Sequence, residues 1–469
     1  MTERMIEEVP KGLTWRATAN GACLNVIRLI VVICGFCVAN FVGAQILPLK
    51  ESSSISKGAA VVEAATTNQP ESISVWTHSP EHTDEFNALK AAAAAFNRKQ
   101  RAYRVEIFPS IYRSYEDRVQ NAAASGTLPW LVELDGPFLY PFAWAGYLQP
   151  IDKLVPEELL TDLLPSVKLQ GTYNGRLYSL GQFESGLGLW GNRRYLREAG
   201  VRVPSVESPW GLAEFEEALA RLSRLDGVEY ALNLGVYDAR GEFYSYAYAP
   251  ILQGFGGDLI DRGTYRSAKG VLDGPRSVAA MTRFQQWFRQ GWTRAVFDRT
   301  DDFEEGKAAL SWMGHWKYPR YLKALGDNLV LMPLPDFGRG IKTGTGSWNW
   351  GISSACPNPA GAWEFLAHLM SREEILRMTS ANGAVPARYS ALAQSPLYGA
   401  GGPLRLFAQQ LGAGLGVPRP ATPGYGTIRK AFSDAVTSII AGGEVQHELS
   451  RAADTIDEDI AKNGGYSLR

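Results

Sequence analysis

Two pairs of tryptophans mark the stretch of this chain best suited to stacking on a ligand. Residues 306–351 contain Trp312, Trp316, Trp348 and Trp350, four of the thirteen tryptophans in the sequence. They stand in short runs rich in glycine and polar residues, whereas core tryptophans usually stand in apolar runs. Flat aromatic faces in such runs predict a ligand surface, and packing in the core is the alternative for each single ring.

Three carboxylates also lie in aromatic, glycine-rich surroundings. Asp135 follows a predicted strand, Glu184 lies in a glycine-rich segment, and Glu242 stands beside four tyrosines in residues 236–257. Aromatic rings can cover the C–H face of a pyranose while carboxylates accept hydrogen bonds from its hydroxyls, so the combination predicts a sugar site. Two alternatives stay open at this point. The three carboxylates could serve an exported glycoside hydrolase, which needs a pair held at a defined separation, or they could bind a non-sugar solute such as a polyamine.

Enzyme signatures are missing from the sequence. His78-Ser-Pro-Glu-His82 fits the H-x-x-E-H pattern of some zinc peptidases, but Pro80 and the strand predicted before it argue against the helical face that the pattern needs. Residues 344–347 lack the ending of a phosphate-binding loop, and no G-x-S-x-G motif occurs. We therefore predict no metal, no cofactor and no catalytic residue.

The charge balance argues against a nucleic-acid partner, and the cysteine content predicts a single buried thiol in the folded part. The 47 Lys and Arg residues nearly balance the 48 Asp and Glu residues, so no basic field favours nucleic acid. Of the four cysteines, Cys356 alone lies outside the first forty residues, and we expect it to be a buried, inert thiol. The composition is typical of a protein that binds no nucleic acid, and we expect a monomer.

The N-terminal segment resembles an export signal. Arg28 precedes an apolar run over residues 29–39, and Val42-Gly43-Ala44 offers a small-x-small cleavage site. Residues 1–44 are therefore predicted to be a signal peptide cleaved after Ala44, or an N-terminal anchor, and the protein is expected to be periplasmic. Residues 45–71 are predicted to be a flexible linker.

The folded part begins with the signature of a parallel α/β sheet. A strand over residues 73–76, a loop over 77–82, an amphipathic helix containing Phe86 and Phe96, and a strand over 103–108 follow one another. Glycine recurs so often in residues 174–194 that we predict neither helix nor strand there, but a crossing between domains.

Segments spread over residues 72–463 resemble the extracellular solute-binding proteins of carbohydrate ABC transporters, the group that includes maltose- and trehalose-binding proteins. Each segment is a weak signal, and their order and spacing together are specific. The segments are 124–129 leading to Leu134-Asp135, 143–152, 174–178, Gly191-Asn192 with 195–200, 306–314, Pro333-Leu-Pro335, and Pro418-Arg-Pro420 through Tyr425.

The resemblance implies an α/β fold of two lobes with a ligand cleft between them and three interdomain crossings, near residues 180, 334 and 385. Lobe I would comprise 72–180 and 335–385, and lobe II 181–334 and 386–469. The protein would be a non-enzymatic receptor that delivers a mono- or oligosaccharide to an inner-membrane permease and its ATPase. The implied ligand contacts are Ser79, Glu81, Asp135, Glu184, Glu242, Tyr246, Trp316, Trp348, Arg419 and Tyr425.

This sequence departs from the family pattern at three places. Trp130 stands where an acid is usual, Gly191 where a tyrosine is usual, and residues 77–82 are unusual in their two histidines. The resemblance therefore leaves open which sugar this chain would bind.

Overall fold

The computed structural model describes residues 69–110, 115–236, 242–295 and 302–467, all within one compact unit. The predicted signal segment 1–44 and nearly all of the predicted linker 45–71 lie outside the described residues. Among the residues described, no helix is long and apolar enough to cross a membrane.

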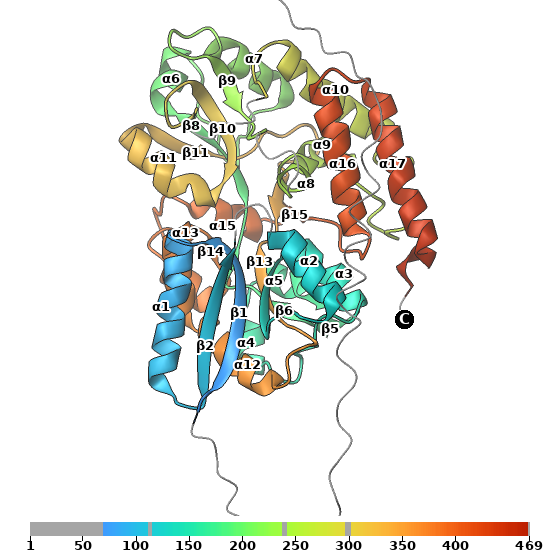
Figure 1. Cartoon of the computed structure of the whole chain (residues 1–469). Helices are drawn as coiled ribbons and strands as arrows, with labels where there is room; N and C mark the ends of the chain where they lie inside the picture. The colour runs from blue at the N-terminus through green and yellow to red at the C-terminus, as the bar shows by residue number, and fades with distance from the viewer. Residues whose placement is uncertain (1–68, 111–114, 237–241, 296–301, 468–469) are drawn as a thin grey trace, which may run out of the picture. The chain divides into compact units, whose positions relative to one another are not determined.

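A five-stranded mixed sheet contains the N-terminal strands. Its order is β2 (Tyr103–Ser110), β1 (Glu71–Pro80), β3 (Leu131–Asp135), β13 (Trp348–Ile352) and β6 (Ser179–Leu180). The predicted strand-helix-strand unit is confirmed, because β1 pairs in parallel with β2 and α1 (Asp84–Lys99) connects them. β13 runs antiparallel to β3, which brings a segment far along the chain into the middle of the sheet (Figure 1).

The predicted loop over residues 77–82 is wrong at its beginning. β1 continues to Pro80, with an irregularity in its pairing to β2 between Trp76 and Pro80. Thr77 and Ser79 continue the alternation of buried residues along the strand. The H-x-x-E-H pattern thus lies on an extended strand and the turn after it, and no helical face for metal ligands forms.

A four-stranded mixed sheet has the order β11 (Leu329–Met332), β8 (Leu187–Asn192), β10 (Ala308–Gly314) and β9 (Tyr230–Asn233). The prediction that residues 174–194 form no strand is wrong, because β8 is an inner strand of this sheet. Its glycines serve close packing: a Cβ at Gly188 would lie 2.6 Å from the Leu331 side chain, and one at Gly191 2.8 Å from Met332. Glycine here gives room to the neighbouring strand rather than ending the element.

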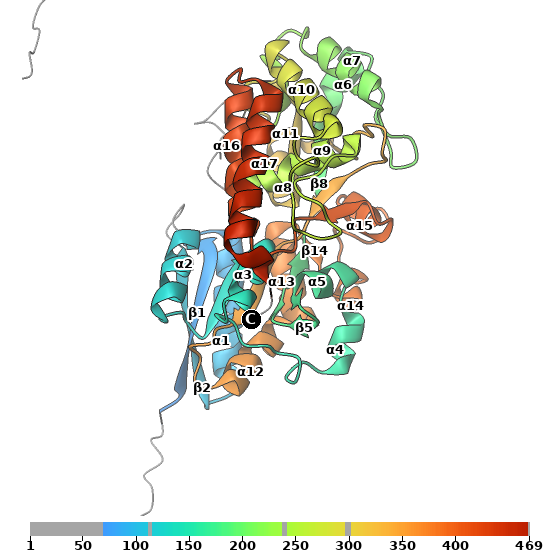
Figure 2. The ribbon, with the colours of Figure 1, turned by 90° about the vertical axis from the view of Figure 1, so that its right-hand side faces the viewer.

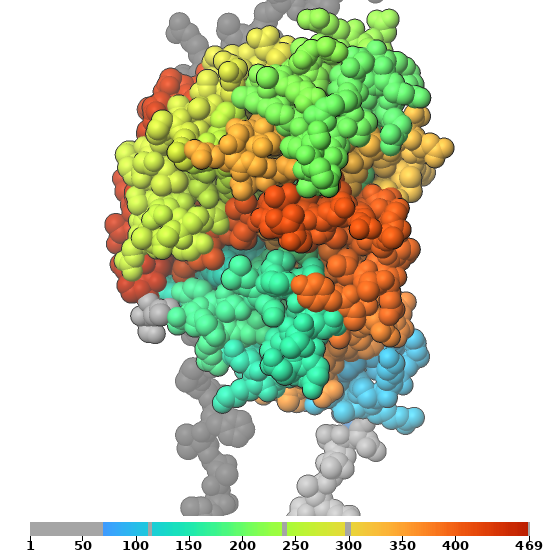
Figure 3. All heavy atoms as spheres, turned by 180° about the vertical axis from the view of Figure 1, so that it is seen from behind, coloured from blue at the N-terminus to red at the C-terminus, as the bar shows by residue number. Residues whose placement is uncertain are grey.

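Short strands and helices complete the fold. α16 (Tyr425–Ile440) and α17 (Val445–Lys462) lie side by side, beside α8 (Phe243–Ala247) and α10 (Pro275–Arg289), in both ribbon views (Figures 1 and 2). From behind, the orange-red segment that includes α15 (Arg405–Gly412) lies on the surface between the green and teal segments (Figure 3). The remaining strands are β4 (Thr172–Tyr173), β5 (Arg176–Leu177), β7 (Phe183–Glu184), β12 (Thr343–Thr345), β14 (Val385–Pro386) and β15 (Gly416–Pro418). The remaining α-helices are α2 (Tyr115–Ser125), α3 (Leu139–Trp144), α4 (Glu157–Asp162), α5 (Pro165–Gln170), α6 (Arg193–Glu198), α7 (Leu212–Leu222), α9 (Ala249–Phe255), α11 (Tyr318–Leu325), α12 (Pro359–Leu369), α13 (Arg372–Asn382) and α14 (Tyr389–Leu392).

The tryptophans of the stretch 306–351 divide between buried core positions and partly exposed positions. Trp312 and Trp350 are each 1% exposed and belong to the hydrophobic cores, while Trp316 and Trp348 are partly exposed. Cys356 is 4% exposed, so the predicted burial of this thiol is confirmed, and burial raises its pKa to about 11, which disfavours the reactive thiolate.

Candidate functional site

The site residues of the first sheet are set by strand ends that meet at one edge. β3 ends at Asp135, and β13 begins at Trp348, which pairs directly with Asp135 across the two strands. β1 ends next to them with Ser79 and Pro80. The carboxyl ends of strands in α/β sheets are where ligands bind, so this edge presents an acid and an aromatic ring at a suitable place.

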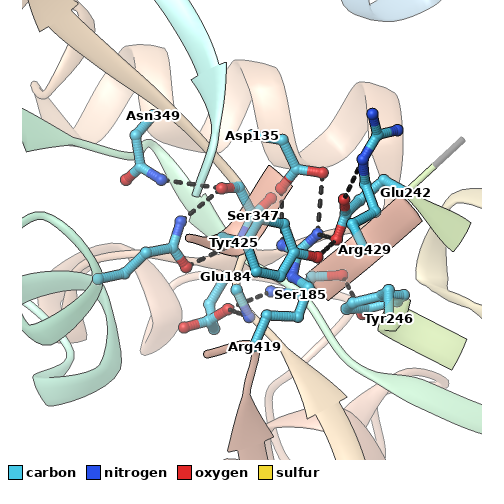
Figure 4. Close-up of polar contacts among 12 residues, drawn as sticks. Asp135, Glu184, Ser185, Glu242, Tyr246, Ser347, Asn349, Arg419, Tyr425 and Arg429 are labelled. Carbon is cyan, nitrogen blue, oxygen red and sulfur yellow. Dashed lines mark hydrogen bonds and ion pairs between the residues drawn. The ribbon is translucent and has the colours of Figure 1, made fainter. Parts of the chain in front are cut away.

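Arg419 lies at the centre of a buried polar cluster. Its guanidinium donates to both carboxylate oxygens of Asp135, at 2.6 and 2.9 Å, and to Oε1 of Glu242 at 2.8 Å. The hydroxyl of Tyr425, at the start of α16, also donates to Oε1 of Glu242. Figure 4 shows these side chains converging. We call Asp135, Glu242, Arg419 and Tyr425 the Arg419 cluster.

Burial controls the protonation of this cluster. It raises the pKa of Glu242 to about 7, with Asp135 and Glu116 adding to the rise and Arg419 and Tyr425 opposing it. Burial by itself would lower the pKa of Arg419, but the charges of Asp135 and Glu242 outweigh it, and the guanidinium stays charged. The cluster therefore joins one fixed cation to a carboxylate that titrates near neutrality.

A second cation lies next to the cluster. Arg429 stands one helical turn after Tyr425 on α16, and its guanidinium lies 3.3 Å from Glu116 of α2 and 4.0 Å from Glu242. Arg429 and Glu116 are not among the residues predicted from the sequence. The four-residue spacing from Tyr425 was a signal that could have found Arg429, because residues so spaced share a helix face.

Glu184 and Tyr246 are close enough to Arg419 to interact with its charge. Glu184 accepts the backbone N–H groups of Ser185 and Gly346, each at 2.8 Å, and burial raises its pKa. The Tyr246 hydroxyl lies 2.7 Å from the Ser185 hydroxyl, and the Tyr246 ring lies 5.1 Å from the Arg419 guanidinium. One carboxylate oxygen of Glu184 is therefore occupied by the protein's own backbone.

Trp316 connects to this group through Tyr246. Their ring centroids are 6.0 Å apart. The position of Trp316 depends on the preceding glycine, because a Cβ at Gly314 would lie 1.9 Å from the indole. Gly314 thus allows the indole to lie back over the end of β10.

The loop before Trp348 is held by hydrogen bonds to the Ser347 backbone. Its carbonyl accepts from the side chains of Gln170 at 2.5 Å and Asn349 at 2.8 Å, and from the backbone of Gly136 at 2.9 Å. Its N–H donates to Gln170 at 3.0 Å. These bonds fix the backbone that carries Trp348, and Figure 4 shows the bond between Asn349 and Ser347.

A small pocket opens beside Trp348. About 240 Å³ of empty space lies here, a volume that includes open solvent, and the charged lining groups are Glu116, Glu133 and Asp135. Tyr115, Phe138 and Phe142 contribute aromatic surface. The pocket thus combines carboxylates with aromatic rings, the pairing that the sequence predicted for a sugar site.

The predicted residues do not all meet. Asp135, Trp348, Arg419, Glu242 and Tyr425 lie together, and Tyr246, Glu184 and Trp316 adjoin them through the contacts given above. Ser79 is buried, and its backbone N–H donates to the Thr77 hydroxyl at 3.1 Å. Glu81 is exposed, and among the described residues no hydrogen bond or ion pair joins it to the others.

Known proteins resemble this chain in sequence and in fold. The family model described as bacterial extracellular solute-binding protein matches residues 91–400. A protein of Streptomyces antibioticus, named an uncharacterized lipoprotein in the oleD 5′ region, is 21% identical over 326 residues, which cover 67% of this chain and 70% of that protein. The maltotriose-binding protein of Pyrococcus abyssi is 23% identical over 282 residues, 58% of this chain and 57% of its own length.

Among solved structures, the GacH receptor of Streptomyces glaucescens superposes with a TM-score of 0.72 at 21% identity. The match covers 85% of this chain and all of that chain, and the GacH structures include complexes with acarbose and an acarbose homolog. At this identity the likeness shows the fold: an α/β fold of the periplasmic solute-binding type with two mixed sheets.

Proposed function

Because this chain belongs to the bacterial extracellular solute-binding protein family, whose members serve ABC transporters as non-enzymatic receptors, we propose that it captures a mono- or oligosaccharide and delivers it to a membrane permease. The observation that carries the sugar assignment is the Arg419 cluster with Trp348 beside it. Carboxylates and a guanidinium bind hydroxyls through charge-assisted hydrogen bonds, and the indole covers an apolar sugar face. The relatives named maltotriose-binding and GacH support a sugar over other solutes.

The residues of the cluster come from both proposed lobes. Asp135 belongs to the range 72–180 assigned to lobe I, and Glu242 and Arg419 belong to ranges assigned to lobe II. We propose that the lobes move about crossings near residues 180, 334 and 385, and that sugar hydroxyls take over part of the bonding between Arg419 and the two carboxylates. A ligand that contacts both lobes favours the closed state, and closure is the signal to the permease.

The glycoside hydrolase alternative has no support. The family is non-enzymatic, Asp135 is paired with Arg419 through both oxygens, and Glu184 accepts two backbone N–H groups. The polyamine alternative would leave the aromatic surroundings unchanged, and the binding experiment below separates it from a sugar.

The family supports a location outside the cytoplasmic membrane, and the periplasm and the cleavage site are proposals. Members are extracellular, and we propose that residues 1–44 direct export to the periplasm with cleavage after Ala44. N-terminal sequencing of the exported protein tests this proposal, since a mature chain that begins at Met1 would contradict cleavage.

Calorimetric titration with mono-, di- and trisaccharides, and in parallel with polyamines, tests the proposed ligand class. We expect saturable sugar binding that Trp348→Ala and Trp316→Ala each weaken by about tenfold or more, because buried aromatic contacts dominate binding energy. Trp363→Ala on α12 is the matched control and is expected to keep wild-type affinity. Binding of polyamines without sugar binding would overturn the assignment, and wild-type affinity in either site variant would remove that ring from the site.

A further inference from the structure

The motif His78-Ser-Pro-Glu-His82, which is left without a metal role, contributes one histidine to the wall of the site. The His78 ring lies parallel to the Trp348 indole, with ring centroids 3.7 Å apart and an angle of 4° between the planes. Its side chain is 17% exposed. His78 therefore covers one face of Trp348, and a ligand can stack only on the other.

Carboxylates hold His78 from two sides. Oε2 of Glu133, on β3, lies 2.8 Å from Nδ1, and Oε2 of Glu85, on α1, lies 3.5 Å from Nε2. The backbone N–H of His78 donates to the same Glu133 oxygen at 3.2 Å, and the Thr77 hydroxyl donates to it at 2.6 Å. Glu85 is in turn held by the Asn382 side chain at 3.0 Å. We call His78, Glu85, Glu133 and Trp348 the His78 corner.

These contacts make His78 a cation with a fixed ring plane. Burial alone would lower the pKa of His78, but the charges of Glu133 and Glu85 raise it to about 10, and the same pairing lowers the pKa of Glu85 to about 2. A cation within about 6 Å of an indole face is attracted by the negative charge above the ring. The imidazolium can therefore fix both the position and the tilt of Trp348.

We propose that His78 is a positioning residue for the ligand: held between Glu133 and Glu85, it lies flat under Trp348 and orients the indole for stacking on the sugar. It reaches the ligand only through Trp348. This inference rests on the proposed sugar site, and it adds the residue that sets the geometry of that site. Preorganised binding groups need such support, because a ring free to rotate loses part of the stacking energy on binding.

Paired measurements on full-length protein test the proposal. We expect His78→Gln to weaken sugar binding about tenfold, the size of a lost cation–π contact with its orientation. His368→Gln is the matched control, since His368 also lies against a ring, Phe96 at 5.6 Å, and 3.6 Å from a carboxylate, Glu374, but outside the site. We expect it to keep the affinity within about twofold. Equal affinity of His78→Gln and wild type would overturn the proposal.

Fluorescence supplies a readout that a merely structural role would not change. A protonated imidazole in contact with an indole quenches the fluorescence of the indole. The emission of Trp348 is obtained by subtracting the spectrum of the same protein carrying Trp348→Phe. This emission should be weak in the wild type and should rise in His78→Gln. No rise would overturn the proposal. His78→Phe, which keeps the flat ring without the charge, replaces His78→Gln if that variant does not fold, and the same rise is expected.

The two hypotheses fail differently. If Trp348→Ala leaves sugar affinity unchanged, the proposed site is wrong whatever His78 does. If Trp348→Ala weakens binding while His78→Gln does not, the site stands and the positioning role of His78 is wrong.

Discussion

Two histidines, each next to a tryptophan of the proposed site, have opposite chemistry. His78 lies flat against Trp348 between two carboxylates, and His315 lies edge-on to Trp316, with ring centroids 5.3 Å apart and planes at 87°. His315 is 3% exposed, and burial lowers its pKa to about 4. Its Nδ1 lies 2.9 Å from the Asn382 carbonyl, which can only accept, so Nδ1 carries the proton. We call His315 and Trp316 the His315 corner.

The difference shows that neighbours, rather than residue type, decide what a buried histidine does. Next to Glu133 and Glu85 the charged ring is favoured and stacks face-on with the indole. At His315 burial outweighs the opposing effects of the Asn382 carbonyl and the Glu85 charge, so the neutral ring is favoured. Asn382 joins the two corners, since its side chain donates to Glu85 while its carbonyl accepts from His315.

The largest expected effect is a loss of stability at high pH from the His78 corner. The pKa of His78 rises from 6.5 to about 10 on folding, so its contribution is fully present below pH 6.5 and is lost as the pH rises through 10. The shift corresponds to at most about 5 kcal/mol. Urea unfolding of wild type and His78→Gln between pH 6.5 and 10 measures it: the wild type should lose several kcal/mol more than the variant, and parallel curves would contradict the charged state.

The His315 corner should show the opposite slope at lower pH. Its pKa falls from 6.5 to about 4 on folding, so the unfolded chain takes up a proton that the folded chain does not, and stability falls as the pH drops from 6.5 to 4. The cost is at most about 3 kcal/mol. Unfolding of His315→Gln over the same range should lack this fall, and an unchanged fall would assign it to other groups.

A smaller effect is expected from the way Trp316 is positioned, which differs from the way His78 holds Trp348. Trp316 depends on the missing Cβ of Gly314, so Gly314→Ala should displace the indole and weaken sugar binding about tenfold. Gly412→Ala is the control, because a Cβ there meets nothing within 4 Å. Calorimetry on both variants gives the comparison. Wild-type affinity in Gly314→Ala would mean that the position of Trp316 does not matter for the ligand.

The smallest effect sharpens the contrast between the corners. Asn382→Ala removes the side-chain bond to Glu85 but keeps the carbonyl that accepts from His315, and it should cost about 1 kcal/mol of stability. In nitrogen NMR spectra the signals of the His78 ring should shift while those of the His315 ring stay in place. A shift of the His315 signals alone would contradict this assignment, because it would mean that the Asn382 side chain acts on the His315 corner and not on the His78 corner.

Residues of the candidate site could be predicted from the sequence where they end a predicted strand or lie in a segment that resembles the family. Asp135 was found as the acid that ends a strand, and the structure places it against Arg419 and Trp348. Glu81 was carried over by position into residues 77–82, where the pattern is unusual, and it lies exposed. Arg429 was missed because its partner Glu116 is on another helix.

The sequence by itself determined the elements with a clear local pattern and the residue types available for binding. Period-two alternation in β1 and the three-and-four spacing in α1 reflect local burial, and local burial is readable from neighbours in the chain. It also supplied the motif 78–82 and the argument against a metal, because Pro80 is incompatible with the helical face.

Only the tertiary structure decided which tryptophans are exposed enough to contact a ligand and which histidines are favoured in the charged form. Trp312 and Trp350 stand in the same kind of run as Trp316 and Trp348, yet the first two are core residues. β8 is a strand because its glycines receive side chains from β11, a contact distant in sequence. His78 is charged because Glu133 and Glu85, from two other elements, reach it. Charge and exposure depend on contacts between distant segments, and no local pattern contains them.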